Sequence, residues 1–260
     1  MKANHYAGAG RRWALGATLV YGPIAAELVA MSPHSLAGCT VLDAGAGTGA
    51  VSAALVALRA RPIAMDLSID MLAWDARARA PCAVADIRAL PVLAGCVDAA
   101  VAAFVLNHLM QPSAGLAELI RVTRPGGAVL ASVFSQASRS QARDRVDAVA
   151  HDAGWQVPDW YVDLKTTVVP ILGSAAAMGT AAHAAGLAGI VVEERPVDVG
   201  VTEPEQLVSY RLGQPLFASW LDSIGPRRAQ RIASHAADVI RPIMRPYRPT
   251  VVFLAARTPA

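Results

Sequence analysis

The chain has few cysteines, and their positions exclude two architectures common in small proteins. Cys39, Cys82 and Cys96 form no C-x-x-C pair and no spacing typical of a metal site. A disulfide scaffold and a zinc-stabilised fold are therefore not expected. We interpret the three thiols as reduced, small hydrophobic groups, which favours a reducing, cytoplasmic location.

Lysine and net charge are also scarce. Lysine occurs only at Lys2 and Lys165, and the formal net charge is +3. That charge is too small to favour nucleic acid as a partner. We interpret Arg227, Arg228 and Arg231 as the solvated face of a helix rather than as a phosphate-binding patch.

Long apolar runs are missing as well. No run approaches the ~20 residues of a membrane-spanning helix, so no membrane partner is expected. Arg11 and Arg12 precede the apolar stretch 13–20, a pattern loosely similar to a twin-arginine export signal. Pro23 and Glu27 interrupt the apolar region, which favours the cytoplasm over export.

The chain does contain enough apolar residues for one large core. Of its 260 residues, 54% are hydrophobic and 17% are charged. This composition is typical of a globular protein rather than a disordered one. We find no internal repeat, low-complexity tract or inter-domain linker, so residues 1–260 are expected to form a single domain.

Apolar periodicity predicts alternating strands and helices. The strands are expected near 40–44, 62–66, 82–86, 97–104, 128–134, 189–193 and 248–257, and the helices near 49–59, 69–79, 113–123 and 174–185. Such alternation is typical of an α/β protein with a mostly parallel sheet and helices on both faces. The last strand is expected to pair antiparallel at the edge of the sheet.

Three segments outside this pattern are expected to cover the sheet. Residues 1–39 are mildly helical and form an N-terminal cap. Residues 138–172 combine a charged helix with an aromatic-rich loop at 154–161. Residues 202–247 begin with a capping box at 202–205 and carry two amphipathic helices. We interpret the last two segments as lid insertions.

The stretch 41–52 carries the clearest chemical signal. A predicted strand runs through Asp43 into Gly45, Gly47 and Gly49, and a helix follows. Glycines at alternate positions let the backbone turn sharply and approach a ligand closely. They also fit the dinucleotide signature G-x-G-x-x-A. A carboxylate two residues before the first glycine would repel a diphosphate, so Asp43 favours a cofactor with a cationic end, unless it merely caps the turn.

Two further acids close the next predicted strands. Asp66 lies about twenty residues after the glycine loop, where an acid can bind a ribose diol. Asp86 ends the following strand and could accept a hydrogen bond from an adenine amine. Leu67 and Met71 could pack on the adenine face. Each acid alone could equally cap a helix or be solvated.

More motifs follow the glycine loop and the two acids. They are Val97-Asp98, Leu106-Asn-His108-Leu109, Pro112, Glu118, Arg121-Val122 and Arg124-Pro-Gly-Gly127. With this order and spacing, residues 41–135, about a third of the chain, resemble class I S-adenosylmethionine (SAM)-dependent methyltransferases of the small-molecule, type-11-like kind. The resemblance implies a Rossmann-like fold with a mostly parallel seven-stranded sheet, an antiparallel edge strand and a cofactor-binding core at 40–135.

The resemblance also implies a cofactor and its ligands. SAM would be the methyl donor and S-adenosylhomocysteine (SAH) the product, and no metal is expected. Asp43, Gly45, Gly47 and Thr48 would line the methionine end, Asp66 with Leu67 and Met71 would hold the ribose and adenine, and Asp86 and Ile87 would flank the adenine. Phe104 would touch the methionine portion or the adenine, unless it belongs to the sheet core. Residues 1–39 would cover the cofactor and part of the substrate.

His108 is the residue expected to act as a general base. It follows the fourth predicted strand, at the carboxyl edge where ligands of α/β sheets bind, and imidazole titrates near neutral pH. Alternatively, the nearby backbone holds this histidine and it has no chemical role. His5, His151 and His183 are weaker candidates, and His151 is expected to pair with Asp147 on a helix surface.

Three functions remain open at this stage. The first is methyl transfer to an oxygen, nitrogen or carbon atom of a small, partly apolar molecule, by a monomer or homodimer. The second is a SAM-binding fold that transfers no methyl group, with a regulatory, partner or cyclisation role, because fold alone does not fix function. The third is a nicotinamide-dependent oxidoreductase, which Asp43 disfavours. Trp155, Trp160 and Tyr161 either wall a substrate pocket or form the core of a lid.

Overall fold

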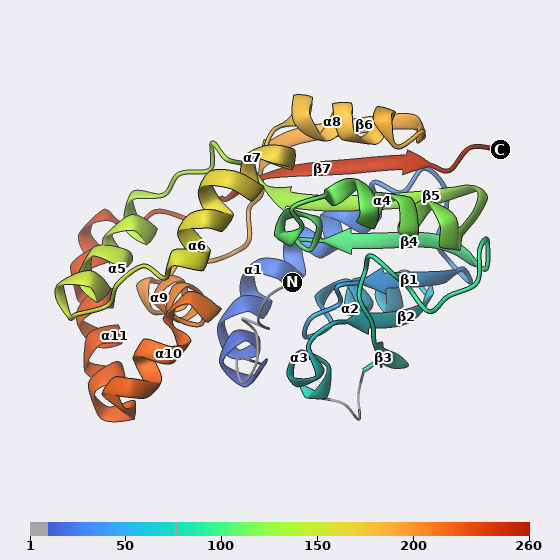
Figure 1. Ribbon diagram of the computed structural model, residues 1–260. Helices are drawn as coiled ribbons and strands as arrows, with labels where there is room; N and C mark the ends of the chain where they lie inside the picture. The colour runs from blue at the N-terminus through green and yellow to red at the C-terminus, as the bar shows by residue number, and fades with distance from the viewer. Residues whose placement is uncertain (1–9, 76, 78) are drawn as a thin grey trace.

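The protein folds around one seven-stranded sheet (Figure 1). A computed structural model describes residues 10–75, 77 and 79–260, so His5 and Tyr6 lie outside the described residues. The strands are β1 (Thr40–Ala44), β2 (Arg61–Asp66), β3 (Cys82–Val84), β4 (Val97–Ala103), β5 (Thr123–Phe134), β6 (Ala188–Pro196) and β7 (Thr250–Arg257). Their spatial order is β3-β2-β1-β4-β5-β7-β6. The predicted α/β class and mostly parallel sheet are confirmed.

The position of β7 differs from the expectation. Neighbouring strands from β3 through β5 pair in parallel, and β7 is antiparallel as predicted. However, β7 lies between β5 and β6, so β6 forms the edge of the sheet. Burial explains this order. Residues 251–256 of β7 are all buried, whereas β6 exposes most of its side chains, and an edge is the better place for the more exposed strand.

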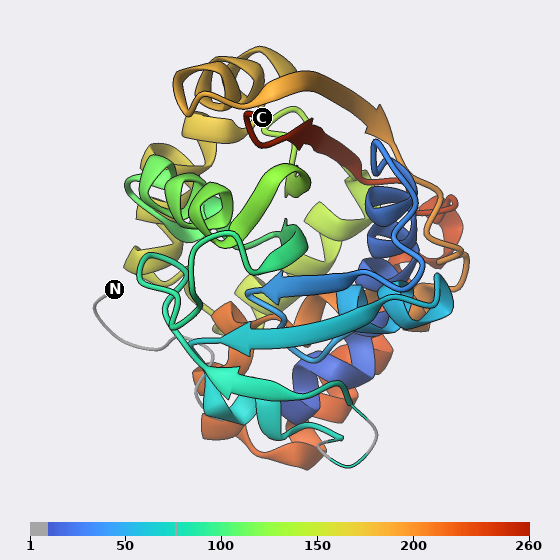
Figure 2. The same cartoon turned by 90° about the vertical axis from the view of Figure 1, so that its right-hand side faces the viewer.

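Helices cover both faces of the sheet (Figure 2). On one face lie α1 (Gly10–Ala30) and α2 (Ala50–Ala57), whose apolar side chains join a core with Val41, Val101 and Leu130. On the other face lie α4 (Pro112–Val122) and α8 (Ala175–Ala184), which join a second core around Leu42, Ala100 and Val129. Alternate residues of each strand therefore point to opposite cores, as the pleat requires.

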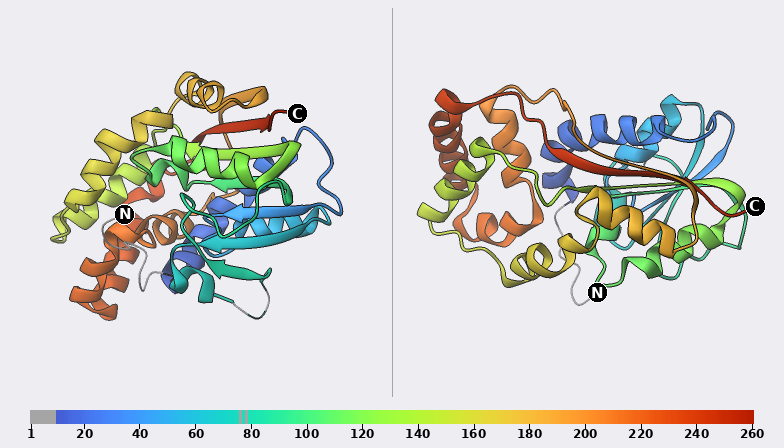
Figure 3. Two further views of the ribbon diagram at one scale, coloured as in Figure 1. Left: turned by 45° about the vertical axis from the view of Figure 1, so that its right-hand side comes forward. Right: turned by 90° about the horizontal axis from the view of Figure 1, so that it is seen from above.

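A further group of helices lies beyond one end of the sheet, at the end to which β4 and β5 point (Figures 1 and 3). It contains α5 (Gln141–Asp152), α6 (Asp159–Asp163), the π-helical turn η2 (Leu164–Val168), α7 (Val169–Leu172), α9 (Pro204–Leu212), α10 (Pro215–Ile224), α11 (Pro226–Ile240) and the 3-10 turn η3 (Arg241–Ile243). We call these elements the helical layer. Chain segments separated by more than 50 residues thus meet at the ends of the strands.

Several local expectations are corrected. The helix expected at 69–79 is shorter, since α3 covers only Ile69–Ala73. The aromatic-rich loop is partly helical, because α6 begins after Pro158 and contains Trp160 and Tyr161. The second insertion carries three helices rather than two. Its first helix is capped by Glu203 with Gln206, one residue later than the predicted box.

Among the described residues, one single helix is long and apolar enough to cross a membrane by length and composition, and the bent pair Asp159–Leu172 with Ala175–Ala184 passes the same test if it is taken as one span. The single helix is α1, which holds 21 residues near the N-terminus, although no apolar run of that length was expected from the sequence. In the structure Val20, Ile24 and Leu28 of α1 are fully buried in the core with α2 and the sheet. A core helix passes the same test, so the length of α1 carries no conclusion about a membrane.

Candidate functional site

A cavity of about 530 Å³ opens at the carboxyl ends of the parallel strands. Its floor comes from the glycine loop after β1, from residues 103–108 after β4 and from Phe134 at the end of β5. Trp13 and Tyr21 of α1 form one side, and the helical layer closes the other. This is the end of an α/β sheet at which ligands bind.

The glycine loop needs glycine for both its conformation and its packing. Gly45 has φ 76° and Gly47 has φ 51°, values that favour glycine. A Cβ atom on Gly45 would lie 2.6 Å from Val105, so β4 and the loop could not come together with a larger residue. The loop is fixed to the neighbouring strand, because the N–H groups of Gly45 and Ala46 both donate to the Met65 carbonyl oxygen.

Asp66 lines the cavity and is held by backbone N–H groups. Its two carboxylate oxygens accept hydrogen bonds from Gly47 and Ser68, each at 2.8 Å. Burial raises the pKa of Asp66, and these hydrogen bonds oppose the rise. Carboxylate oxygens carry about four lone-pair sites in total, so Asp66 keeps capacity for a ribose diol. Met71 and Thr48 lie on the same side of the cavity.

Arg79, a residue the sequence analysis missed, braces this region. Its guanidinium donates to the carbonyl oxygens of Met71, Leu72 and Gly47 at 3.1, 2.8 and 3.1 Å. A single side chain thus ties the end of α3 to the glycine loop. An arginine that donates only to backbone carbonyls has no sequence signature, because its partners are set by the fold.

Asp43 lies beneath the loop rather than in the cavity wall. It is buried, and one carboxylate oxygen accepts a hydrogen bond from the Ser52 hydroxyl at 2.6 Å. The other oxygen has no hydrogen-bond partner in the described part of the chain. Burial raises the pKa of Asp43 to about 6. Its direct contact in this structure is with the first turn of α2, so it supports the loop from below.

Asp86, Ile87 and Leu67 also lie outside the residues that line the cavity. Asp86 pairs with Arg88, and these hydrogen bonds lower the pKa of the Asp86 carboxyl. Ile87 is buried in the core beneath α4. The expected role of Asp86, Ile87 and Leu67 at the adenine stays a prediction. It would require Asp86 to give up its ion pair with Arg88 and to accept a hydrogen bond from the ligand instead.

Phe104 lines the cavity and also packs, half-buried, against the core of the sheet. Its backbone has φ 56°, a conformation that L-residues rarely adopt. The ring contacts Phe134 and Tyr21 at centroid distances of 4.5 and 4.9 Å, and Tyr21 stacks on Trp13. These rings form an apolar wall between the glycine loop and the helical layer.

His108 and Asn107 also line the cavity, on the 3-10 turn η1 (Leu106–His108). The structure therefore brings the expected base to the same cavity as the glycine loop. The side-chain oxygen of Asn107 is buried and has no hydrogen-bond partner among the described residues. An amide oxygen in this state is available to accept from a ligand.

The aromatic residues of the first insertion divide into two groups. Trp155 belongs to the core of the helical layer, where it packs on Phe217 at 4.2 Å and donates to the Leu216 carbonyl oxygen. Trp160 and Tyr161 line the cavity. The lid-core interpretation thus applies to Trp155, while the substrate-pocket interpretation stays a prediction for Trp160 and Tyr161.

The remaining histidines of the described chain lie away from the cavity lining. His151 was expected to pair with Asp147, and this expectation is wrong. Asp147 instead accepts two hydrogen bonds from Arg211 of α9, at 2.6 and 2.7 Å. A guanidinium matches a carboxylate with two parallel bonds, which a histidine cannot offer. His183 is exposed and contacts its own helix through the Gly179 carbonyl oxygen.

The helical layer adds polar residues that the sequence did not single out. They include Arg143, Lys165, Tyr210, Arg211 and Gln214, joined by Tyr247 from the segment that follows the layer, and all line the cavity. No local pattern could have found them, because they come from four separate segments between residues 143 and 247. No group of three or more His, Cys, Asp or Glu side chains able to hold a metal occurs in the part of the chain that the structure describes.

The residues present fit SAM. A Cβ atom at Gly45 would collide with Val105. Because Gly45 has no side chain, the backbone of the loop can approach the ligand closely. The buried Asn107 oxygen has no partner among the residues that the structure describes and suits an ammonium donor, and Asp66 suits a ribose diol. The aromatic wall of Phe104, Tyr21 and Trp13 attracts cations such as a sulfonium through its ring faces.

Comparison with known sequences agrees with this site. A family model described as a methyltransferase domain matches residues 42–131. A demethylmenaquinone methyltransferase of Mycolicibacterium gilvum is 41% identical over 95 residues, which cover 36% of this chain and 42% of that protein. The ubiquinone/menaquinone biosynthesis C-methyltransferase UbiE of Syntrophotalea carbinolica is 36% identical over 119 residues, 42% of this chain and 50% of that protein. The match thus spans half or less of these relatives.

Solved structures resemble the chain over most of its length. Phosphoethanolamine N-methyltransferase 2 of Haemonchus contortus, bound to SAM, covers 91% of this chain and 52% of its own, with TM-score 0.57 and 18% identity. The [4+2]-cyclase SpnF covers 92% and 80%, with TM-score 0.54 and 19% identity. At such identities the likeness shows the fold alone. The domain match and the fold agree, and residues 42–131 of this chain match the methyltransferase domain family.

Proposed function

We propose that this protein transfers a methyl group from SAM to a small, partly apolar molecule. The observation that carries the proposal is one continuous cavity with two chemically different ends. At one end lie the glycine loop and Asp66, and at the other lie aromatic and polar side chains of the helical layer. A cofactor and an acceptor can therefore bind side by side in the same cavity.

The protein's contribution to such a reaction is mainly positioning. When bound, SAM supplies an electrophilic methyl group. Phe104, Trp160 and Tyr161 would hold an apolar acceptor in line with that methyl group and keep water away. Fixing two reactants in a near-attack arrangement can lower a barrier by ~7–11 kcal/mol.

His108 is the group we assign to proton removal. It lies between the glycine loop and the helical layer on the cavity wall. A hydroxyl, phenol or amine acceptor must lose a proton as it is methylated, and imidazole can take that proton near neutral pH. The His108→Ala variant should still bind SAM but should turn over ~10²–10⁴-fold more slowly. Full turnover by this variant would remove His108 as the base, and His183→Ala serves as the matched exposed control.

The acceptor of this chain does not follow from its relatives. Those relatives are named for methylation of demethylmenaquinone or ubiquinone and menaquinone precursors, and they match less than half of this chain. The acceptor-side residues Trp160, Tyr161, Tyr210 and Tyr247 lie outside the segment 42–131 matched by the family model. A small, partly apolar acceptor is what the cavity wall supports.

Titration calorimetry with SAM, SAH and NAD tests cofactor use. SAM and SAH should bind, NAD should not, and Asp66→Ala should weaken SAH binding strongly by removing the ribose ligand. Binding of NAD without SAM would refute the proposal. Release of SAH across a set of candidate acceptors then tests methyl transfer, and tight binding with no turnover on any acceptor would favour a role without methyl transfer.

A further inference from the structure

The acceptor end of the cavity carries an excess of positive charge. Five charged residues line the whole cavity: Asp66, Arg143, Asp163, Lys165 and Arg211. Asp66 belongs to the cofactor end, where backbone N–H groups hold it. The helical layer therefore contributes three cations and one carboxylate. Lys165 is one of only two lysines in the chain.

Arg211 is the cation that the protein itself neutralises. Its guanidinium makes two hydrogen bonds to Asp147 and lies 5.2 Å from the centre of the Phe217 ring. Arg211 is buried, and a buried arginine paired in this way is a structural link between α9 and α5. The charges that remain on the cavity wall are those of Arg143, Lys165 and the Asp163 carboxylate, and no ion pair joins Asp163 to either cation in the described part of the chain.

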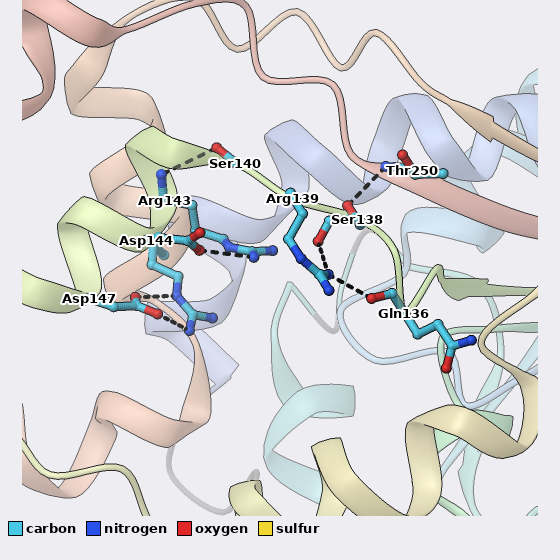
Figure 4. A network of polar contacts seen from close by, with 9 residues as sticks. Gln136, Ser138, Arg139, Ser140, Arg143, Asp144, Asp147 and Thr250 are labelled. Atoms are coloured by element: carbon cyan, nitrogen blue, oxygen red, sulfur yellow. Dashed lines mark hydrogen bonds and ion pairs between the residues drawn. The ribbon is translucent and has the colours of Figure 1, made fainter.

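Arg143 has only a weakly neutralising partner. Its side chain is 23% exposed, and its ion pair is with Asp144, the next residue, at 3.1 Å. The Asp144 side chain is 58% exposed, so water screens much of its charge. Figure 4 shows Arg143 extending from α5 toward Arg139, away from the side of the helix that carries Asp147. Arg143 also lines the cavity, so its charge is available to a ligand there.

Lys165 has no ion pair in the described part of the chain. Lys165 is an exposed residue of the cavity lining, and the partial burial of its ammonium lowers its pKa. Tyr161 opposes this change, and the charges of Arg143, Arg211 and Arg139 lower the pKa further. Like charges gathered at one place repel each other. A negative charge from a ligand would relieve this repulsion, so the cluster favours an anion.

Neutral hydrogen-bond donors lie beside these cations. Burial raises the pKa of Tyr247, and it raises that of Tyr210 well above the usual value. Both phenols therefore keep their protons at neutral pH. Both line the cavity, and Tyr247 shares side-chain hydrogen bonds with Tyr210 and Arg143. Each phenol has one O–H donor, so this linked pair can offer one donor to an anionic oxygen.

We propose that Arg143, Lys165 and Tyr247 form an anion subsite, and that the methyl acceptor carries an acidic group, a carboxylate or a phosphate ester, on an apolar body. The body packs on Trp160, Tyr161 and Phe134, and the acidic group reaches the cations. Arginine binds both kinds of anion through its planar fork. This assignment rests on the proposed function, because it names the acceptor of that same cavity.

Matched ligands test the subsite on the full chain saturated with SAH. Naphthoate, naphthyl phosphate and the neutral naphthamide share one aromatic body, and their binding is measured by calorimetry and by quenching of tryptophan fluorescence. At least one anion should bind roughly tenfold or more tightly than naphthamide, as expected for a charge-assisted hydrogen bond. A preference for naphthoate identifies a carboxylate site, and a preference for naphthyl phosphate identifies a phosphate ester site.

Variants connect that preference to the named residues. Arg143→Met and Lys165→Met should each reduce anion binding roughly tenfold and leave naphthamide binding unchanged. Arg143→Lys keeps the charge and should retain most of the affinity. Arg227→Met removes an exposed arginine of α11 outside the cavity lining and should have no effect. Unfolding curves for each variant establish that the fold is intact.

Two results would overturn the subsite. One is equal binding of both anions and naphthamide, and the other is unchanged anion binding in Arg143→Met and Lys165→Met. SAH binding separates this outcome from failure of the proposed function. If SAH binds and the anions show no preference, only the subsite is wrong, whereas absence of SAH binding removes the proposed function itself.

Discussion

At the scale of single residues, Asp43 shows how a motif acid can act without touching a ligand. It ends β1 among apolar strand residues and holds the Ser52 hydroxyl at the start of α2. One of its oxygens has no partner among the described residues, so burial disfavours the ionised form. Asp43 therefore fixes the loop geometry through its hydrogen bond with Ser52. When its carboxylate is ionised, the burial of that charge lowers the free energy of unfolding.

This cost predicts a pH dependence. The folded-state pKa of about 6 exceeds the ordinary value of 3.8, so the folded protein binds this proton more tightly than the unfolded chain. The contribution of Asp43 to the free energy of unfolding is therefore complete below pH ~4 and is lost as the pH rises through 6. A two-unit shift corresponds to on the order of 3 kcal/mol.

The Asp43→Asn variant tests that sign. An amide does not ionise, so the variant should gain on the order of 3 kcal/mol relative to the wild type between pH 4 and pH 7. Urea unfolding at several pH values measures the difference. Parallel pH profiles for the two proteins would show that Asp43 is not the group responsible.

At the scale of elements, the approach of α1 to α9 depends on one glycine. A Cβ atom on Gly16 would lie 2.4 Å from the Ser209 carbonyl oxygen and 3.0 Å from the Tyr210 Cα atom. Both are backbone atoms, which cannot move aside as a flexible side chain can. Tyr210 and Arg211 come directly after Ser209 in α9, and both line the cavity. The contact between Gly16 and Ser209 therefore also fixes the position of these two cavity residues.

A pair of substitutions within α1 isolates this effect. Gly16→Ala should destabilise the protein by ~1–3 kcal/mol, because it forces the two helices apart. Gly22 lies in the same helix, and no atom beyond its chain neighbours lies within 4 Å of its added Cβ, so Gly22→Ala should change stability by less than about 0.5 kcal/mol, because the gain in helix propensity is offset by the restriction that Pro23 places on the residue before it. Urea unfolding measures both, and equal effects of the two substitutions would contradict the close approach.

At the scale of the whole molecule, the helical layer and the sheet share a core. Ile24 of α1, Leu130 of β5, Val146 of α5, Phe217 of α10 and Ile240 of α11 all belong to one buried cluster. A layer held by its own separate core could unfold alone. A shared core instead couples the layer to the sheet, so the two should unfold together.

Phe217→Ala tests this coupling. The side chain is fully buried and packs on Trp155, so its loss should cost ~3–5 kcal/mol. Tryptophan fluorescence and far-ultraviolet circular dichroism should report one common, lower midpoint. Two separate transitions would show that the layer unfolds independently. Leu93 is 81% exposed, and Leu93→Ala should leave stability within about 0.5 kcal/mol.

The cofactor end could be predicted from the sequence because its residues are close together in the chain. Gly45, Gly47, Asp66 and Met71 line the cavity as expected, and so does His108. Local spacing could not show that Asp43 would lie beneath the loop or that Asp86 would pair with Arg88. Those outcomes depend on how the loops pack after each strand.

The sequence by itself determined the α/β class, the glycine loop and the cofactor family, because strand periodicity and glycine conformation are local properties. Only the tertiary structure decided that β7 lies inside the sheet, that Trp155 belongs to the core while Trp160 lines the cavity, and that Arg143, Lys165 and Tyr247 line the same cavity. These residues are far apart in the chain. They come together because the helical layer packs on the ends of the strands, and packing between distant segments leaves no periodic pattern in the sequence.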